Sequence, residues 1–499
     1  MGLGELETLE AGRSTVLETA FGDAQRPSGV RVRPSAADVG PTFISGWPRT
    51  MGPVIWKLLH TSPGKPMAQV RSTALRLLRA TLSDEGALRV QARRLGVVKR
   101  QGKVDSYALL ATVILGVAVR GPTAIAVIGR VLSEVAGIRL ARSTVWARFT
   151  PSFRNLVQHV LDGVVQSSRH RPVQPPGVLS AFRDVIAVDA TVIKVHDDLQ
   201  HIWRGTRRNT AKASLKVHTW VRAFTGELLK YKLTADAHGD GRAFGVEQAL
   251  RGCLVLFDKA YSSPSLWHRI QGVGGYFLTP LPADRNPEIL RQLRRHRGRA
   301  RDLRGRPLRE AVEGLSRAYI DVEAQFRCKV RRYGGATRNR WVRAGFRVVA
   351  VRNKQGKYNF YVTNAPPDKL PAEAIVRTYR LRWEVETFFK TAKTGSELDH
   401  LPSSKQHIVE TLVYAALLRA TTSMQALAQV RARVAHPKGL LINPGQWQKW
   451  WNRRLRGLLD DLLPAYPALG TQEVALMLSD PNIGRPTNRS TFLTCAYSS

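Results

Sequence analysis

The stretch from residue 184 to residue 280 constrains the fold most, because apolar runs and helical patterns follow one another there in a fixed order. Five runs rich in β-branched and aromatic residues predict strands: Asp184–Val195, Leu215–Phe224, Leu228–Ala235, Cys253–Phe257 and Gly275–Pro280. Helical patterns over Arg242–Arg251 and Pro264–Gln271 separate the last three runs. The sequence therefore predicts an α/β fold in which three consecutive strands precede two helix–strand units.

This order is that of a ribonuclease-H-like α/β domain, in which the first three strands form an antiparallel meander and later strands add in parallel. We assign it to residues 177–280 and 366–430. Between these segments, residues 281–365 form a mainly β insertion with a basic surface, since residues 285–357 hold 22 Arg and Lys against six acidic residues. Strands are expected there at Ala318–Val330, Trp341–Arg352 and Tyr358–Thr363.

The flanking regions carry weaker patterns. Residues 1–60 are rich in Gly, Pro, Ser and Thr and predict a flexible N-terminal arm, whereas residues 61–170 have a helical pattern. Basic outer positions on these helices favour a DNA-binding domain, and a helical packing or dimerisation domain is an equal alternative. Further helices, including one at Ile408–Leu427, follow the α/β domain. Residues 431–499 form a basic C-terminal region, for which oligomerisation is one interpretation.

The net charge of +39 predicts a polyanionic partner such as nucleic acid. The three cysteines, Cys253, Cys328 and Cys495, are far apart, which argues against a zinc module and a disulfide framework and fits a reducing cytoplasm. The N-terminal residues lack a signal-peptide pattern. Ala108–Val119 is apolar but too short to span a membrane, so we interpret it as a buried helix.

Two aspartates on the predicted strands are candidate catalytic or metal-binding residues. Asp189 lies in the middle of an apolar strand, where an ionised carboxylate is costly unless it is paired or bound to a cation. Asp258 ends the fourth strand, at a strand-to-loop junction where α/β folds collect functional residues. In the predicted topology the first and fourth strands are neighbours. The two carboxylates would then repel each other unless a divalent cation such as Mg²⁺ lay between them.

A third carboxylate is expected from a helix running from about Ala372 to Lys393. At about 100° per residue, Tyr379, Arg382, Glu386 and Lys393 fall within one narrow stripe of that helix, and Lys390 lies beside it. Glu384 points away from the stripe. A carboxylate flanked by cations, placed next to two strand aspartates, predicts a metal ligand with phosphate-binding groups on either side.

Other polar residues lie outside these three positions. His218 alternates with apolar neighbours and is expected to be a strand-face residue rather than a ligand. His238 and Asp240 fall in a turn, HGDG, for which a turn role is expected. The Arg291–Arg309 cluster favours contact with a DNA backbone over a merely solvated face.

The pattern Tyr-x2-Arg-x3-Glu-x6-Lys resembles the signature of the DDE transposases grouped with insertion sequence 4. Tyr361-Val-Thr-Asn364 and Phe388-Phe389-Lys390 strengthen the match. Asp189, in Asp-x-Thr, and Asp258, in Asp-x-Ala-Tyr, look like the family's first and second aspartate motifs. The resemblance covers about residues 180–430, and it departs from the family where Ala190 replaces the more usual Gly or Ser.

This resemblance implies a catalytic triad of Asp189, Asp258 and Glu386 that holds two Mg²⁺ ions, for which Mn²⁺ can substitute, and that cleaves and rejoins DNA. It implies phosphate contacts by Tyr379, Arg382 and Lys393 of the signature, with Lys390 as an additional candidate. It also implies an aromatic of the insertion that stacks on a flipped base, with Trp341 as first candidate and Tyr358 as second.

The resemblance implies the transposase of a bacterial insertion sequence, located in the cytoplasm at the nucleoid. It would act on double-stranded DNA, namely the terminal inverted repeats and target DNA, as a homodimer in a synaptic complex. Two alternatives stay open. One is a ribonuclease-H-like nuclease without strand transfer, which would not need the Tyr379–Lys393 signature. The other is a non-catalytic DNA-binding derivative, which would be expected to have lost an acidic ligand.

Overall fold

A computed structural model describes residues 72–463 apart from 100–103, 116–123, 137–139, 207–210, 295–301, 331–339, 394–397, 434–443 and a few shorter positions. The expected arm at residues 1–60 and the C-terminal region beyond 463 lie outside the described residues. No helix among those described is long and apolar enough to cross a membrane. The described part of the buried helix predicted at Ala108–Val119 lies in α4 (Ser106–Leu115), all of whose residues are buried, and residues 116–119 lie outside the described residues.

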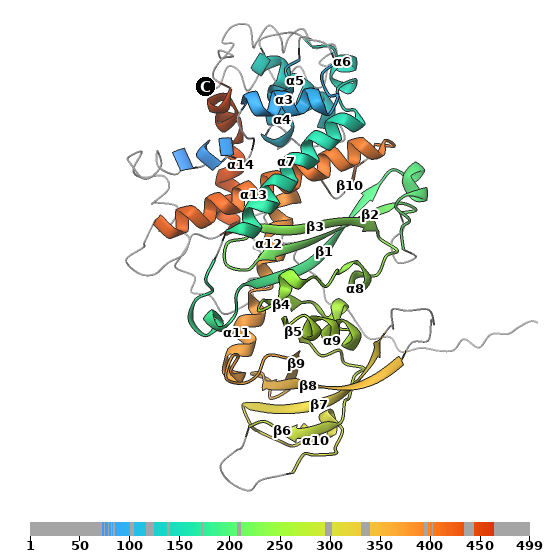
Figure 1. The fold of residues 1–499 in the computed structure, drawn as a ribbon, viewed down its shortest axis with the longest axis vertical. Helices are drawn as coiled ribbons and strands as arrows, with labels where there is room; N and C mark the ends of the chain where they lie inside the picture. Colours follow the sequence, from blue (N-terminus) through green and yellow to red (C-terminus); the bar gives the residue numbers. More distant parts are fainter. Residues whose placement is uncertain are drawn as a thin grey trace, which may run out of the picture. The chain divides into compact units, whose positions relative to one another are not determined.

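One sheet organises the fold, with strand order β3-β2-β1-β4-β5-β9-β8-β7-β6 and β10 (His400–Leu401) beside β1 (Figure 1). The strands β1 (Val185–Val195), β2 (Ser214–Arg222) and β3 (Leu228–Ala235) pair antiparallel. β4 (Leu254–Phe257) and β5 (Tyr276–Pro280) add in parallel next to β1. The predicted meander and the parallel addition are confirmed, and the whole is a mixed α/β fold.

The insertion continues the same sheet. β9 (Tyr358–Thr363) pairs antiparallel with β5, and β8 (Arg340–Arg352), β7 (Tyr319–Val330) and β6 (Ile289–Gln292) follow outward. Its three predicted strands are confirmed to within one residue. Trp267 of α9 (Pro264–Gly272) packs on Phe277 of β5 and on Phe346 of β8. A single apolar core therefore joins the insertion to the first five strands and includes α10 (Leu308–Val312).

Helices cover the sheet face that bears Ala187, Ile193 and Val217. α12 (Trp383–Lys393) lies on β1 and β2, α13 (Gln406–Arg433) packs on α12, and α7 (Pro151–His170) packs on both β3 and α13 (Figure 1). The remaining helices of this layer are α3 (Glu85–Arg94), α5 (Ala124–Ala136), α6 (Arg142–Trp146) and α14 (Pro444–Leu462). The residues predicted as a helical domain thus share one continuous core with the sheet.

The predicted helix over Arg242–Arg251 is wrong. The chain forms one turn of helix, α8 (Asp240–Ala243), then extended backbone at Phe244, then a 3₁₀ turn, η3 (Gln248–Leu250). The Phe244 ring is buried against Trp220 and Phe257, with centroids 5.6 and 4.9 Å away. Tertiary packing of this ring outweighs the local pattern, and the residues that follow, Gly245 and Val246, are weak helix formers.

Candidate active site

Asp189 and Asp258 come from neighbouring parallel strands. The pairing of β1 with β4 ends with Val188 opposite Phe257, so the next residues on each strand, the two aspartates, lie side by side. Paired strands run about 4.8 Å apart. Side chains two residues apart in a strand share a face, so Asp189 lies on the face of Ala187, the face that α12 covers. Both aspartates are half-buried.

Glu386 approaches the same face from α12, which lies on β1 and β2. Its charge, together with that of Asp258, contributes to raising the pKa of Asp189. Glu384 has different surroundings: burial raises the pKa of its carboxyl, and its charge interaction is with Arg431 of α13. Of the two glutamates of this helix, Glu386 is therefore the one that lies near Asp189.

Arg382 joins the strand side of the site to the helix side. Its Nη1 lies 3.4 Å from Asp189 Oδ2, and its Nη2 donates to Glu386 Oε1 at 2.6 Å. The residue is only 9% exposed, and its guanidinium carbon lies 5.8 Å from the centre of the Tyr379 ring. Sequence reasoning placed Arg382 at the site as a phosphate-binding group and missed its contact with both carboxylates.

The backbone around Arg382 is not the unbroken helix predicted for residues 372–393. A 3₁₀ turn, η5 (Ala372–Ala374), leads into α11 (Ile375–Arg380), and α12 begins only at Trp383. At the junction, the amides of Leu381 and Arg382 donate to residues three positions back, as in a 3₁₀ turn. This tighter turn changes the direction of the side chains on either side. The predicted stripe is therefore split between two helices.

The electrostatics of the site favour a cation. Burial raises the pKa of Asp189 to about 6. The Ala190 amide and the positive charge of Arg382 lower this pKa, and the negative charges of Asp258 and Glu386 raise it further. Carboxylates that are costly to ionise together are stabilised as anions by a nearby positive charge. Burial also raises the pKa of Tyr379 to about 12. Its hydroxyl is therefore a neutral hydrogen-bond donor at physiological pH.

The donor chemistry fits a hard divalent cation, because all three side chains offer carboxylate oxygens. Within the described part of the chain, however, no three His, Cys, Asp or Glu side chains stand close enough together to hold a metal ion. The guanidinium of Arg382 lies between Asp189 and Glu386. A metal ion shared by these two residues therefore requires Arg382 to move.

Comparison with known proteins identifies the family. The family described as transposase DDE domain matches residues 180–421, the segment that carries all three carboxylates. The chain is also 24% identical over 425 residues to the transposase for insertion sequence element IS231F of Bacillus thuringiensis subsp. israelensis, a match that covers 78% of this chain and 86% of that protein. The chain carries a transposase DDE domain.

The chain is also similar to two further proteins. The transposase is 22% identical to that of element IS231E from Bacillus thuringiensis subsp. finitimus, over 70% of this chain and 78% of that protein. Among solved structures it is similar to a piggyBac transposase in a synaptic complex with hairpin DNA, with 10% identity, a TM-score of 0.41, and coverage of 81% of this chain and 84% of that one. At that level the structural similarity carries no inference.

The two lysines predicted to bind phosphate, Lys393 of the signature and Lys390, lie along α12 of the transposase. Lys393 is half-buried at the last position of the helix, and Lys390 is exposed with its Nζ 6.0 Å from the centre of the Trp383 ring. Trp383 is 56% exposed and lies three residues before Glu386. It was not among the predicted site residues, although its place directly after Arg382 in the signature was a usable signal.

The two aromatic candidates of the insertion differ in exposure. Trp341 of β8 is 55% exposed, and the Arg327 guanidinium lies 5.2 Å from the centre of its ring. Tyr358 is half-buried, and its hydroxyl donates to the carbonyls of Leu315 and Arg317. The Tyr358 ring is thus part of the packing of the insertion, whereas the Trp341 ring is accessible for stacking.

The Arg-rich segment 291–309 is partly committed to internal contacts. Arg291 pairs with Glu323, and Arg294 pairs with Glu373 at 2.5 Å. Arg309 donates to the carbonyls of Arg285 and Pro282. Residues 295–301 lie outside the described residues. Contact with a DNA backbone stays a prediction for this segment.

A second polar cluster lies on the opposite face of the sheet and was not predicted. Lys216 Nζ lies 3.2 Å from Asp236 Oδ1 and 3.1 Å from Asp240 Oδ1. His218 is buried beside them, with its Nε2 2.9 Å from Thr234 Oγ1 and its Nδ1 4.0 Å from Asp240. The ammonium of Lys216 lies between the two aspartates and offsets part of their negative charge. The contacts of His218 agree with its interpretation as a strand residue.

His218→Gln should flatten the pH dependence of stability. Burial lowers the pKa of His218 in the folded protein to about 4 from 6.5, so folding favours its neutral form. The stabilisation is present above pH 6.5 and is lost as the pH falls through about 4. Over this window the wild type should lose about 3 kcal/mol more unfolding free energy than the variant, as measured by urea unfolding. Parallel pH profiles would contradict the assignment.

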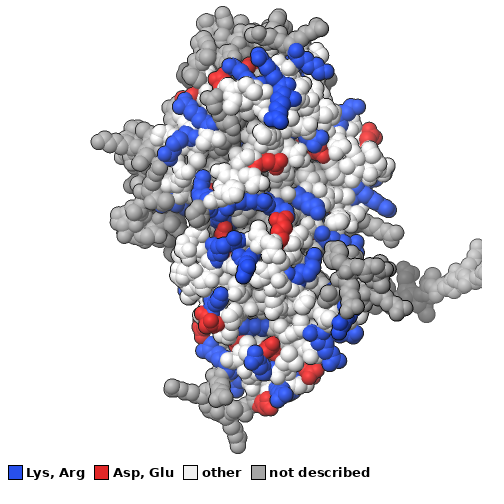
Figure 2. Space-filling view, viewed as in Figure 1, with Lys and Arg blue, Asp and Glu red and all other residues white. Residues whose placement is uncertain are grey.

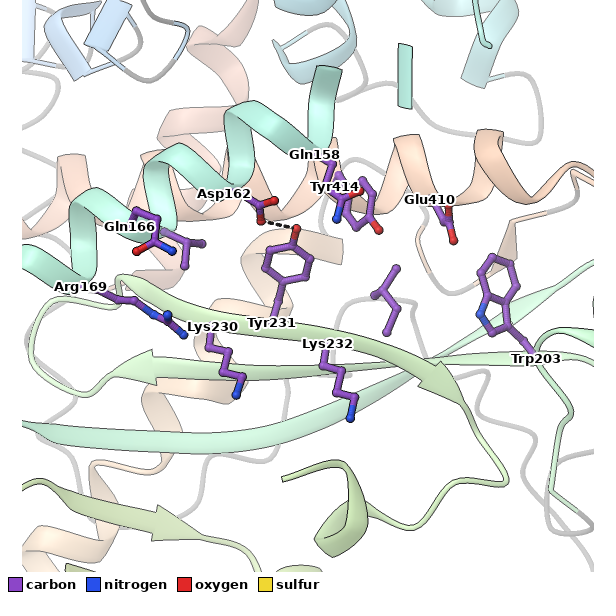
Figure 3. A pocket seen from close by; sticks show the side chains of 12 residues that line it. Gln158, Asp162, Gln166, Arg169, Trp203, Lys230, Tyr231, Lys232, Glu410 and Tyr414 are labelled. Atoms are coloured by element: carbon purple, nitrogen blue, oxygen red, sulfur yellow. Dashed lines mark hydrogen bonds between the residues drawn. The ribbon is translucent and has the colours of Figure 1, made fainter. Parts of the chain in front are cut away.

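A cavity of about 480 Å³ lies away from these residues, between α7, β3 and α13. Figure 3 shows Asp162 of α7 and Tyr231 of β3 meeting across it, where the Tyr231 hydroxyl donates to Asp162 at 2.7 Å. Tyr414 of α13 packs edge-on against Tyr231. None of the three predicted catalytic carboxylates lines this cavity. Its polar side chains connect the helical layer to the edge strand.

Proposed function

We propose that this transposase binds the terminal inverted repeats of a bacterial insertion sequence, cleaves the DNA there and joins the ends to target DNA. The observation that carries the proposal is the convergence of Asp189, Asp258 and Glu386 on one face of the sheet. We further assign the catalytic domain to the ribonuclease-H-like fold, which the strand order β3-β2-β1-β4-β5 supports. The Tyr379–Lys393 spacing supports the insertion sequence 4 type.

The three carboxylates would hold two Mg²⁺ ions, or Mn²⁺ in their place, because hard oxygen ligands suit these cations. Bound there, the ions would activate the attacking hydroxyl and neutralise charge on the leaving oxygen. The protein's own side chains would bind and orient the DNA end. Phosphate contacts fall to Tyr379, Arg382, Lys390 and Lys393, and Trp341 would stack on a base.

Surface charge supports a DNA partner. On the face drawn in Figure 2, Lys and Arg side chains outnumber Asp and Glu side chains and extend from the helical layer to the insertion. In the helical layer, Arg93 and Arg94 at the end of α3 and Arg142 at the start of α6 are exposed. We propose that this layer contacts DNA, and that the protein acts as a homodimer that synapses two ends in the cytoplasm, at the nucleoid.

The test is Mg²⁺-dependent cleavage of DNA that carries the element's own flanking ends. We expect the wild type to cut at the element boundary and Glu386→Gln to bind the ends without cutting. Glu384→Gln makes the same chemical change two residues away and should cut like the wild type. Cutting by Glu386→Gln would reject Glu386 as the third carboxylate. Cutting without joining by the wild type would favour the nuclease, and end binding without cutting would favour the non-catalytic derivative.

Lys393→Ala should weaken binding to the DNA ends and reduce the slope of log affinity against log salt by about one, because one phosphate contact is lost. Affinity is measured by fluorescence anisotropy across a salt series. Lys212→Ala removes an exposed lysine from the loop before β2, outside the helical layer, the insertion and the proposed site, and should leave the slope unchanged. A slope equal to that of the wild type would remove Lys393 from the phosphate-binding group.

A further inference from the structure

The guanidinium of Arg382 contacts the same carboxylates that would ligate metal. It reaches Asp189 Oδ2 at 3.4 Å through Nη1 and Glu386 Oε1 at 2.6 Å through Nη2. The side chains of these two acids are 26% and 28% exposed, whereas that of Arg382 is 11% exposed. The guanidinium is therefore an internal counter-ion, located between one ligand from the sheet and one from the helix.

Arg382 and a metal ion cannot occupy this position together. A divalent cation bound by Asp189 and Glu386 would meet a full positive charge at the same oxygens, in a half-buried site where charge repulsion is poorly screened. Metal binding must therefore displace the guanidinium, and displacement leaves a buried cation that needs a new partner. Arg382 Nε has no hydrogen-bond partner among the described residues, so a ligand that accepts hydrogen bonds from the guanidinium would also satisfy this donor.

The phosphate of a bound DNA end is the partner that matches. A guanidinium binds a phosphate through two parallel hydrogen bonds, and such charge-assisted pairs are among the strongest in proteins. Arg382 lies in the 3₁₀ junction between α11 and α12, and a change in its side-chain rotamer would leave the backbone of α12 in place. The Tyr379 ring, 5.8 Å away, offers an aromatic surface to the guanidinium in either arrangement.

We propose that Arg382 sets the metal affinity of the site and couples it to DNA-end binding. In the protein without DNA, Arg382 holds Asp189 and Glu386 and keeps the affinity for metal low. On a DNA end, Arg382 transfers to a phosphate and frees the carboxylates. This inference rests on the proposed function, since it takes these carboxylates as metal ligands. Its consequence is that metal and DNA end bind cooperatively and each strengthens the other by the same factor.

The experiment measures Mn²⁺ affinity through the relaxation rate of water protons, with the full chain, with and without a duplex carrying the element end. Wild type should bind Mn²⁺ weakly alone, and the DNA end should tighten that binding by about tenfold, within the range of about 5- to 150-fold typical of coupled sites. Arg382→Gln should bind Mn²⁺ alone about as tightly as the DNA-bound wild type. The DNA end should add little further for this variant.

Two controls separate the possible outcomes. Arg380→Gln removes the same charge from an exposed position two residues away and should keep the wild-type coupling. Asp189→Asn should abolish the tight Mn²⁺ binding of every variant. If Mn²⁺ binding depends on Asp189 but the coupling survives in Arg382→Gln, the inference fails and the proposed function stands. If Asp189→Asn binds Mn²⁺ as tightly as the chain that keeps Asp189, the proposed metal site itself fails.

Discussion

Asp189→Asn and Asp258→Asn should each lower cleavage of the element ends by more than about 100-fold, because losing even an outer partner of a metal ligand typically costs about 10- to 100-fold. An amide keeps the size of the side chain but loses the charge that holds a divalent cation. The β1–β4 register makes the two positions equivalent neighbours, so both variants should be affected to a similar degree. Cleavage is measured as single-turnover cutting of labelled end DNA at saturating protein.

DNA binding separates a ligand defect from misfolding. Without added metal, each variant should bind the DNA ends as well as the wild type or slightly more tightly, because it removes a negative charge from the protein surface that would face the DNA. Asp198→Asn makes the same change at an exposed position just after β1 and should leave both activities intact. Loss of end binding in parallel with cleavage would argue that Asp189 and Asp258 support the fold rather than the chemistry.

Arg347→Met should destabilise the protein by about 3 to 5 kcal/mol, the usual cost of removing one partner from a buried ion pair. Arg347 and Asp321 are each 4% exposed and form two hydrogen bonds, of 2.8 and 2.6 Å. Arg347 Nη1 also donates to the carbonyls of Ala365 and Leu370, in the segment that leads to α11. Urea unfolding followed by circular dichroism measures the loss.

The matched control is Arg291→Met, which breaks a pair between strands of the same sheet. Arg291 is 69% exposed in its pair with Glu323, so this variant should lose less than about 1 kcal/mol. Equal losses from the two variants would mean that burial does not set the contribution of the Arg347 pair. Because Arg347 anchors the chain before α11, its loss should also weaken binding of the DNA ends.

Strand patterns were the most predictable part of this protein. β7, β8 and β9 begin and end within one residue of the prediction, because runs such as FRVVAVR are apolar, β-branched and bounded by turn residues. The neighbourhood of Asp189 and Asp258 also follows from sequence, since it needs only the strand order and the position of each aspartate on its strand. The choice of Glu386 over Glu384 depends on the angle between these two residues around the helix. They are only two positions apart, so an error in the assumed helical twist changes that angle little.

What depends on distant contacts could not be predicted. The break at Leu381–Arg382 contains no Gly or Pro, so a local pattern gives no reason to end a helix there. The bridge from Arg382 to Asp189 spans 193 residues and exists only once α12 lies on β1. The Lys216 cluster likewise depends on bringing Asp240 back to β2. The prediction of a helix over Arg242–Arg251 was wrong for the same reason, because burial of the Phe244 ring against Trp220 and Phe257 outweighs the local helix preference.

The insertion completes the sheet that carries the site, because β9 pairs directly with β5. A protein cut back to the first five strands would present β5 with one whole row of backbone amides and carbonyls unpaired. Such an edge recruits strands from other chains and leads to aggregation. The β-rich insertion therefore covers an exposed sheet edge, in addition to carrying a basic surface. Trimmed versions of this enzyme would need a new edge protector, such as a charged or proline-containing β5, to remain monodisperse.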